Sequence, residues 1–358
     1  MLVLTGCPTA PSRDDGGSTT VGADDAPAIT AAPPTSADAD APEATPRARS
    51  EPPPGPPVPD GVRVFRRDVV SLSLSGDGRF LVGGDLGGKA LLWDLERGVF
   101  VWGDDTPVGN RIRPVVFPER GVRWLAGAFD EPDLPWRLYD AARAELVVGW
   151  GQAGATAVDA AFDRQASRVV VASGKPDLIE VYMIDEAATP PARIWQRATR
   201  ARVVALDASG ERVAWSEGQR VEVRALADDS LVLEITEDAP TSRIVFDGDA
   251  LVGAQGAVVV RWSTSGAPRV ATALADQRLP IRELKHLPRG LVALTRAEEQ
   301  GLVIWDAARG EPVAEVSMGC QCEVHALAAN GCMAACGCAT LAEVRWTRLS
   351  GPAFPQCP

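Results

Sequence analysis

A short unit of four strand-length apolar runs recurs along this chain, and it constrains the fold more than any other feature. Its clearest copy is VVSLSLSGDGRFLVGGDLGGKALLWDLERGVFVW, residues 69–102. Apolar runs rich in β-branched residues and bounded by Gly and Asp are typical of strands and turns. One such meander cannot bury both of its faces alone, so it must stack against further copies of itself.

The third strand of the unit is the easiest to align, and it recurs at intervals of roughly 40 to 45 residues. Its seven copies are marked by Trp93, Tyr139, Ile184, Arg224, Trp262, Trp305 and Trp346. That period, with four strands per unit, is typical of a β-propeller. The sequence therefore predicts an all-β protein, a seven-bladed β-propeller of four-stranded antiparallel blades. Six blades remain an alternative if the fourth or fifth copy is not a full blade.

Two copies resemble the WD-repeat family. The first contains SGDGR, GGD and LLWD, and the sixth contains LVIWDAARGEPV, so the third strands end in Trp93-Asp94 and Trp305-Asp306. The Gly-His dipeptide that precedes the inner strands of that family does not occur in this sequence. The resemblance spans about residues 61–350. It implies a rigid platform that binds other proteins, with the Trp-Asp pairs as structural blade markers.

Ring closure is predicted from the two ends of the repeat region. Only a dozen residues follow Trp346, too few for an outer strand with its turns. The segment GVRVF, residues 61–65, precedes the first inner strand and has no place in the first unit. We therefore expect it to form the outer strand of the last blade, which would leave only short protected edges.

The first seven residues resemble the end of a bacterial lipoprotein signal. Leu4-Thr5-Gly6-Cys7 is similar to a lipobox, which makes Cys7 the predicted lipidation site. A basic region and a full apolar run are missing before it, so we expect the true start codon further upstream. The alternative is an ordinary N-terminus with a chance cysteine.

Residues 8–60 form a linker rich in Pro, Ala, Asp, Ser and Thr. Such a segment buries too little apolar surface to offset its ordering entropy, so we predict a disordered tether. Its nine acidic and three basic residues account for half of the net charge of −12. The acidic balance disfavours nucleic-acid partners, and no apolar run approaches the ~18 residues of a membrane span. The propeller itself is predicted over residues 61–358.

Six cysteines crowd the C-terminal end: Cys320, Cys322, Cys332, Cys336, Cys338 and Cys357. An even set in an exported protein favours disulfides. A hairpin around Ala329-Asn330-Gly331 would place Cys322 opposite Cys338, and a further bond could reach Cys357. Metal binding with His325 is a weaker alternative, because the spacing lacks paired C-x2-C knuckles and His325 has opposite strand parity to the cysteines. A set of reactive thiols is the third possible interpretation of the cluster.

Other candidate motifs point to structure. Residues 83–90 nearly match a phosphate loop, but Ala90 replaces the Ser/Thr and a strand follows in place of a helix. The ten tryptophans are expected to fill space between blades, although Trp136 and Trp195 could lie on loops. Of the only two histidines, His286 is expected on an exposed turn.

These observations predict a non-catalytic protein–protein interaction platform, lipid-anchored in the envelope of a bacterium, at the outer membrane or cell surface. Its partners would be unidentified envelope proteins, it would touch the membrane only through its anchor, and it would be a monomer. We predict no catalytic residues, no metal and no cofactor, since two histidines limit acid–base chemistry. The alternative is a ligand-binding or enzymatic propeller, in which polar groups from several blades converge on the central channel.

Overall fold

The computed structural model describes residues 63–65, 68–104, 111–129, 134–185, 190–298, 300–338 and 342–357. The predicted lipidation site Cys7 and the predicted linker 8–60 lie outside the described residues. In this part of the chain every regular element is a strand, and no helix could span a membrane.

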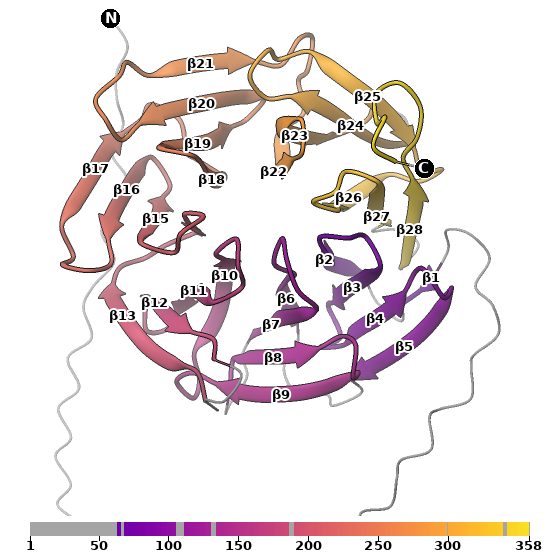
Figure 1. Ribbon diagram of the computed structural model, residues 1–358, viewed down its shortest axis with the longest axis horizontal. Coiled ribbons are helices and arrows are strands. Elements are labelled where there is room, and N and C mark those ends of the chain that lie inside the picture. The colour runs from indigo at the N-terminus through magenta and orange to yellow at the C-terminus, as the bar shows by residue number, and fades with distance from the viewer. Residues whose placement is uncertain are drawn as a thin grey trace, which may run out of the picture. The chain divides into compact units, whose positions relative to one another are not determined.

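The strands form seven four-stranded antiparallel sheets arranged as blades around a ring (Figure 1). The seven-bladed propeller predicted from the repeat is thereby confirmed. The innermost strands are β2 (Val69–Leu74), β6 (Arg111–Val116), β10 (Thr156–Phe162), β14 (Val203–Leu206), β18 (Arg243–Asp247), β22 (Ile281–Leu287) and β26 (Cys322–Leu327).

Each blade then continues outward in chain order. The second strands are β3 (Phe80–Asp85), β7 (Arg123–Phe129), β11 (Arg168–Gly174), β15 (Arg212–Glu217), β19 (Ala250–Gln255), β23 (Gly290–Arg296) and β27 (Met333–Cys338). The third strands are β4 (Ala90–Asp94), β8 (Trp136–Asp140), β12 (Leu178–Met183), β16 (Arg220–Ala225), β20 (Val258–Ser263), β24 (Gly301–Asp306) and β28 (Glu343–Arg348). The outer strands are β5 (Val99–Asp104), β9 (Glu145–Trp150), β13 (Ala192–Ala198), β17 (Leu231–Thr236), β21 (Val270–Ala273), β25 (Pro312–Ser317) and β1 (Arg63–Val64).

The last blade combines both ends of the repeat region, as the sequence predicts. Its sheet order is β1-β28-β27-β26, and Arg63 pairs with Val344 in the antiparallel register. The amide of Phe65 donates a further hydrogen bond to the carbonyl of Ala342. The ring is therefore closed by hydrogen bonds between segments almost three hundred residues apart in the chain.

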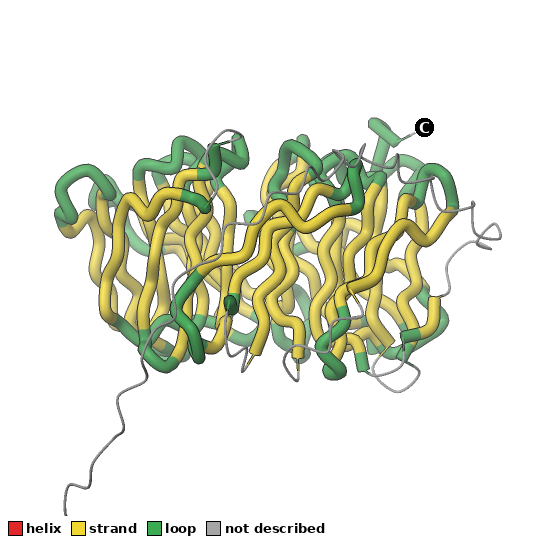
Figure 2. The backbone as a smooth tube through the Cα atoms, turned by 90° about the horizontal axis from the view of Figure 1, so that it is seen from below, coloured by secondary structure: helices red, strands yellow, loops and turns green. Residues whose placement is uncertain are grey.

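Apolar side chains fill the spaces between neighbouring blades, and each cluster draws on two adjacent sheets. The strands span the thickness of the ring, and loops lie at its two faces (Figure 2). Between the first and last blades, buried Phe65 and Trp93 meet edge to face with centroids 5.4 Å apart, close to Ala335 and Val344. Each blade thus buries both faces, which a single sheet cannot do in water.

The tryptophans serve this packing. Eight of the ten are buried and the other two, Trp102 and Trp346, are half-buried. The suggestion that Trp136 and Trp195 lie on loops is wrong, because both are buried residues of strands β8 and β13. Side chains that pack between twisted sheets come from every strand of the meander, so regular spacing at one strand does not identify all of them.

Two of the seven alignment markers need correction. Trp93 packs toward the preceding blade of the ring, in the cluster between the last and first blades. In the third blade this place belongs to Tyr182, because Ile184 lies beyond the end of β12. In the seventh blade Trp346 packs toward the following blade, in the same cluster as Trp93, so the equivalent residue is its neighbour Thr347. Apolar residues recur along each strand, so a residue one or two positions from the equivalent one can be aligned in its place.

The ring closure yields a test of stability. We expect Phe65→Ala to lower the free energy of unfolding by about 3–5 kcal/mol, because it leaves a cavity beside Trp93. Phe100→Ala is the matched control, since Phe100 faces the same indole at 6.2 Å but is 47% exposed. Urea unfolding followed by tryptophan fluorescence measures both. Equal losses in the two variants would contradict a special role for the closing segment.

Candidate functional site

The seven inner strands surround a central channel that contains a cavity of about 580 Å³. Because every blade repeats the same meander around the ring, all inner strands enter the channel from the same face. Five of them, β2, β6, β10, β22 and β26, carry a register shift near their first residues. A β-bulge leaves one residue outside the ladder and re-aims its side chain. The residues in these shifts line the cavity: Val70, Arg113 with Pro114, Val158, Arg282 and Glu323.

Cationic side chains from several blades converge where the inner strands begin. Arg113 and Arg282 occupy bulges, Arg202 immediately precedes β14, and Arg243 is the first residue of β18. Lys285 of β22 also lines the cavity. Four blades, the second, fourth, fifth and sixth, therefore present their cations to one space.

The arginines affect one another. Burial lowers the pKa of Arg113, and the nearby Arg243, Arg111 and Arg282 lower it further, while Asp159 opposes them. Arg113 is exposed to solvent, and its side chain lines the channel cavity. Arg243 is held in place by hydrogen bonds from Nε to the carbonyl of Arg282 and from Nη1 to that of Ser242, both 2.7 Å.

Three titratable groups sit beside these cations. Burial raises the pKa of Asp159, even though Arg243 and Arg113 are near and it accepts a hydrogen bond from the Val204 amide. Burial raises the pKa of Glu283 to about 7, against the opposing influence of Lys285 and Arg243. Burial, aided by Arg282, lowers the pKa of His325 to about 4. At neutral pH the imidazole is uncharged and Glu283 is partly protonated.

Hydrogen bonds between neighbouring inner strands make the channel wall rigid. Ser71 and Ser73 of β2 accept from the amides of Val115 and Phe117. His286 Nε2 lies 2.6 Å from the carbonyl oxygen of Phe246 in the next blade. The expectation that His286 lies on an exposed turn is therefore wrong. The segment LKHLPRG continues strand β22, and its turn begins only after Leu287.

The six C-terminal cysteines form three disulfides: Cys320–Cys338, Cys322–Cys336 and Cys332–Cys357. The disulfide prediction and the bond to Cys357 are confirmed. Cys322 does pair with Cys338 in the strand register, but its bond runs diagonally to Cys336. Cys320, two residues before the strand, takes Cys338 instead. Cys338, which lies opposite Cys322, is thereby already bridged, and Cys322 bonds the other cysteine of β27.

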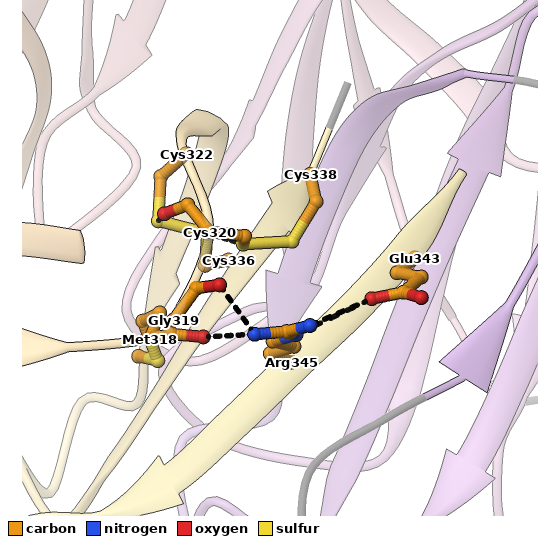
Figure 3. The surroundings of a disulfide bond; sticks show 8 residues. All are labelled: Met318, Gly319, Cys320, Cys322, Cys336, Cys338, Glu343 and Arg345. Atoms are coloured by element: carbon orange, nitrogen blue, oxygen red, sulfur yellow. Dashed lines mark hydrogen bonds and ion pairs between the residues drawn. A yellow bond between two sulfur atoms is a disulfide. The ribbon is translucent and has the colours of Figure 1, made fainter. Parts of the chain in front are cut away.

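The disulfides Cys320–Cys338 and Cys322–Cys336 lie side by side (Figure 3). Arg345 binds the segment that precedes Cys320 in the chain. Its guanidinium donates to the carbonyls of Met318 and Gly319 at 2.9 and 2.6 Å and pairs with Glu343. The sulfur atoms of Cys320, Cys322 and Cys336 lie within 4.8 Å of one another. All three are bridged, whereas metals bind the thiolate form.

His325 does not have the opposite strand parity to the cysteines, contrary to the prediction. The register shift between Cys322 and Val324 places His325 directly across from Cys336. A bulge adds one residue to one strand and thereby reverses the alternation that follows it. Neither ring nitrogen of His325 has a hydrogen-bond partner within the described residues, although the side chain is only 7% exposed.

The Trp-Asp markers make structural contacts. Trp93 lies in the core between the first and last blades, and Asp94 accepts from Arg79 and from the Arg97 amide. Asp306 accepts from the amides of Ala308 and Arg309 in the corresponding turn of the sixth blade. Trp305 donates to Thr295 at 2.9 Å, and Gln277 donates to the same hydroxyl.

The phosphate-loop-like segment is a turn between β3 and β4. The Asp85 carboxylate accepts from the amides of Gly87 and Lys89, at 2.7 and 2.9 Å. A phosphate loop needs such amides free to cradle its ligand. Here an internal carboxylate already occupies them.

No protein family model matches the chain, and no curated protein is significantly similar to it. The sequence reasoning missed the arginine cluster, although a signal was present. Arginine recurs at the start of four inner strands, in RIRPVV, ARVVAL, SRIVFD and IRELKH. An alignment of the first strands of the blades shows this recurrence, just as an alignment of the third strands shows the blade period.

Glu283 provides a test of the channel electrostatics. Its folded pKa of about 7 lies above the ordinary value of 4.5, so the unfolded chain loses this proton first as pH rises. The charged carboxylate therefore destabilises the fold progressively from pH 4.5 to pH 7 and fully above that range. We expect Glu283→Gln to stabilise the protein by on the order of 2 kcal/mol at pH 8 and by little at pH 4.

Chemical denaturation across pH 4–8 measures this effect. Glu315→Gln, which changes an exposed glutamate of the outer strand β25, is the matched control and should show no such pH dependence. A Glu283→Gln gain that is the same at pH 4 and pH 8 would refute the raised pKa.

Proposed function

We propose that this chain is an exported, non-catalytic binding protein whose central channel receives the ligand. The observation that carries the proposal is the convergence of charged side chains from five inner strands on one cavity of about 580 Å³. Cavities of roughly 300–1,000 Å³ with a few convergent polar groups are typical of small-molecule sites. This arrangement favours the channel over the alternative of recognition by exposed loops alone.

The chemistry of the converging groups favours binding over catalysis. Guanidinium groups remain charged and do not transfer protons near neutral pH. Of the two histidines, His286 is engaged in the wall, and His325 is a weak base because its pKa is about 4. General acid–base catalysis is most effective with a pKa near the working pH.

The disulfides support export. Three bridges within 38 residues of chain are typical of oxidising compartments and rare in the cytosol. A lipid on Cys7 would anchor the exported propeller to an envelope membrane, and residues 8–60 would act as the tether. Lipobox resemblance and disulfides support this placement independently of each other.

Mass spectrometry of the protein from its native membrane tests the placement. We expect a mature N-terminus at Cys7 that carries acyl chains, and no alkylation of the six C-terminal cysteines before reduction. Recombinant protein with Cys7→Ser, which keeps all other cysteines, is the control for spontaneous modification. An unmodified Met1 together with six free thiols would overturn the export proposal.

A platform for protein partners is the second candidate. It is supported by the WD-repeat likeness of the sixth blade, where Trp305, Thr295 and Gln277 form a short hydrogen-bond relay. In this relay Gln277 would take the place that a histidine has in the family. Partners would be envelope proteins that dock on the loops around the channel.

A thermal-shift screen of small anions, cations and neutral compounds against the full chain tests the channel proposal. A ligand that binds only the folded state raises its melting temperature. We expect Val70→Trp, which inserts bulk at a bulge in the channel wall, to abolish the shift. Val270→Trp adds the same bulk on the outer rim, where Val270 is 54% exposed, and should leave it unchanged. Equal responses in both variants would refute channel binding.

A further inference from the structure

The charged groups of the channel do not balance one another. Several acidic residues of the cavity are neutralised by local pairs: Glu119 with Arg164 at 3.3 Å, Glu323 with Arg296 at 3.2 Å, and Asp247 with Arg261. The groups that remain are the carboxyls of Asp159 and Glu283 and five cationic side chains, Arg113, Arg202, Arg243, Arg282 and Lys285. The channel of this acidic protein therefore has a surplus of positive charge.

Two of these cations have unused donors. Within the described residues, the guanidinium groups of Arg113 and Arg282 make no hydrogen bond and no ion pair, although both side chains line the cavity. Each occupies a β-bulge, a device that aims a side chain out of the ladder. Arg243 stands near them, and its two backbone hydrogen bonds fix its orientation. The cluster is preorganised before any ligand arrives.

The buried imidazole of His325 provides an independent indication. It lines the same cavity, it is 7% exposed, and neither of its nitrogens has a partner in the described part of the chain. Buried polar groups without a partner are rare, and each one calls for a bound group or a role. A neutral imidazole has one N–H to donate.

We propose that Arg113, Arg243, Arg282 and His325 bind a compact oxyanion that carries two or more negative charges, such as a diphosphate or a polycarboxylate. The guanidinium fork matches the oxygen geometry of phosphate and carboxylate alike. A ligand with several charges would neutralise the surplus and relieve the repulsion between the arginines. This inference rests on the proposed function, because it names the ligand class of the same channel.

Isothermal titration of the full chain at constant ionic strength tests the inference, with pyrophosphate, citrate and spermidine as probes. We expect pyrophosphate or citrate to bind, and each of Arg113→Gln and Arg282→Gln to weaken that binding by about tenfold or more. Neither side chain holds the wall together, so the unliganded melting temperatures should not fall below that of the wild type. Binding of pyrophosphate alone would assign a phosphate ligand, and binding of citrate alone a carboxylate.

Arg164→Gln is the matched control, because Arg164 lines the same cavity but is paired with Glu119. It should retain binding within about twofold of the wild type. Anion binding that survives both Arg113→Gln and Arg282→Gln, or that is lost equally in Arg164→Gln, would overturn the site.

The probes also separate this inference from the proposed function. Binding of spermidine with no binding of either anion would overturn the anion site and leave a ligand-binding channel. If the anions fail and the broader thermal-shift screen finds a neutral ligand blocked by Val70→Trp, the same conclusion follows. If no compound binds in either experiment, both proposals fail.

Discussion

The packing of one amphipathic sheet against the next determines this structure. A four-stranded blade has two apolar faces, and each face needs a neighbour to exclude water. Only a closed ring gives every blade two neighbours. The short pairing of β1 with β28, reinforced by the contact of Phe65 with Trp93, converts a row of blades into that ring. Gly83 and Gly84 show how close the fit is. A Cβ at Gly83 would lie 2.6 Å from the ring of Phe65, and one at Gly84 would lie 2.4 Å from the Ile112 carbonyl oxygen.

The disulfides strengthen the blade in which the closure occurs. One of them joins the two strands of the inner hairpin of the seventh blade, a second joins that hairpin to the segment before it, and the third fixes the C-terminal segment through Cys357. This blade is the only one assembled from both ends of the repeat region among the seven described. All six cysteines come from the C-terminal end of the chain, so the disulfides cross-link that part of the blade, while β1 is held to β28 by hydrogen bonds and by the packing of Phe65.

A closed ring also creates the channel and decides its chemistry. Inner strands pack side by side around a narrow space, and their first residues meet there whatever their separation in sequence. Bulges at these positions turn Arg113 and Arg282 inward, while Ser71, Ser73 and His286 bind backbone groups of the neighbouring strand. The wall is thus held by some polar groups and leaves others unpaired. That division separates structural polar residues from candidate ligand-binding ones.

The sequence alone determined the all-β class, the seven blades, the closing role of the segment that contains Arg63–Val64 and the disulfide character of the C-terminal cysteines. These follow from local signals: strand alternation, turn residues, a fixed period and an even number of thiols.

Other features were decided only by the tertiary structure. The diagonal bond from Cys322 to Cys336, the place of His325 opposite Cys336 and the position of His286 in the channel wall all depend on strand registers and bulges. A single inserted residue reverses which face a side chain occupies, and no local pattern records it. The convergence of the arginines likewise exists only once the ring has closed, because their charges come together from blades that are distant in the chain.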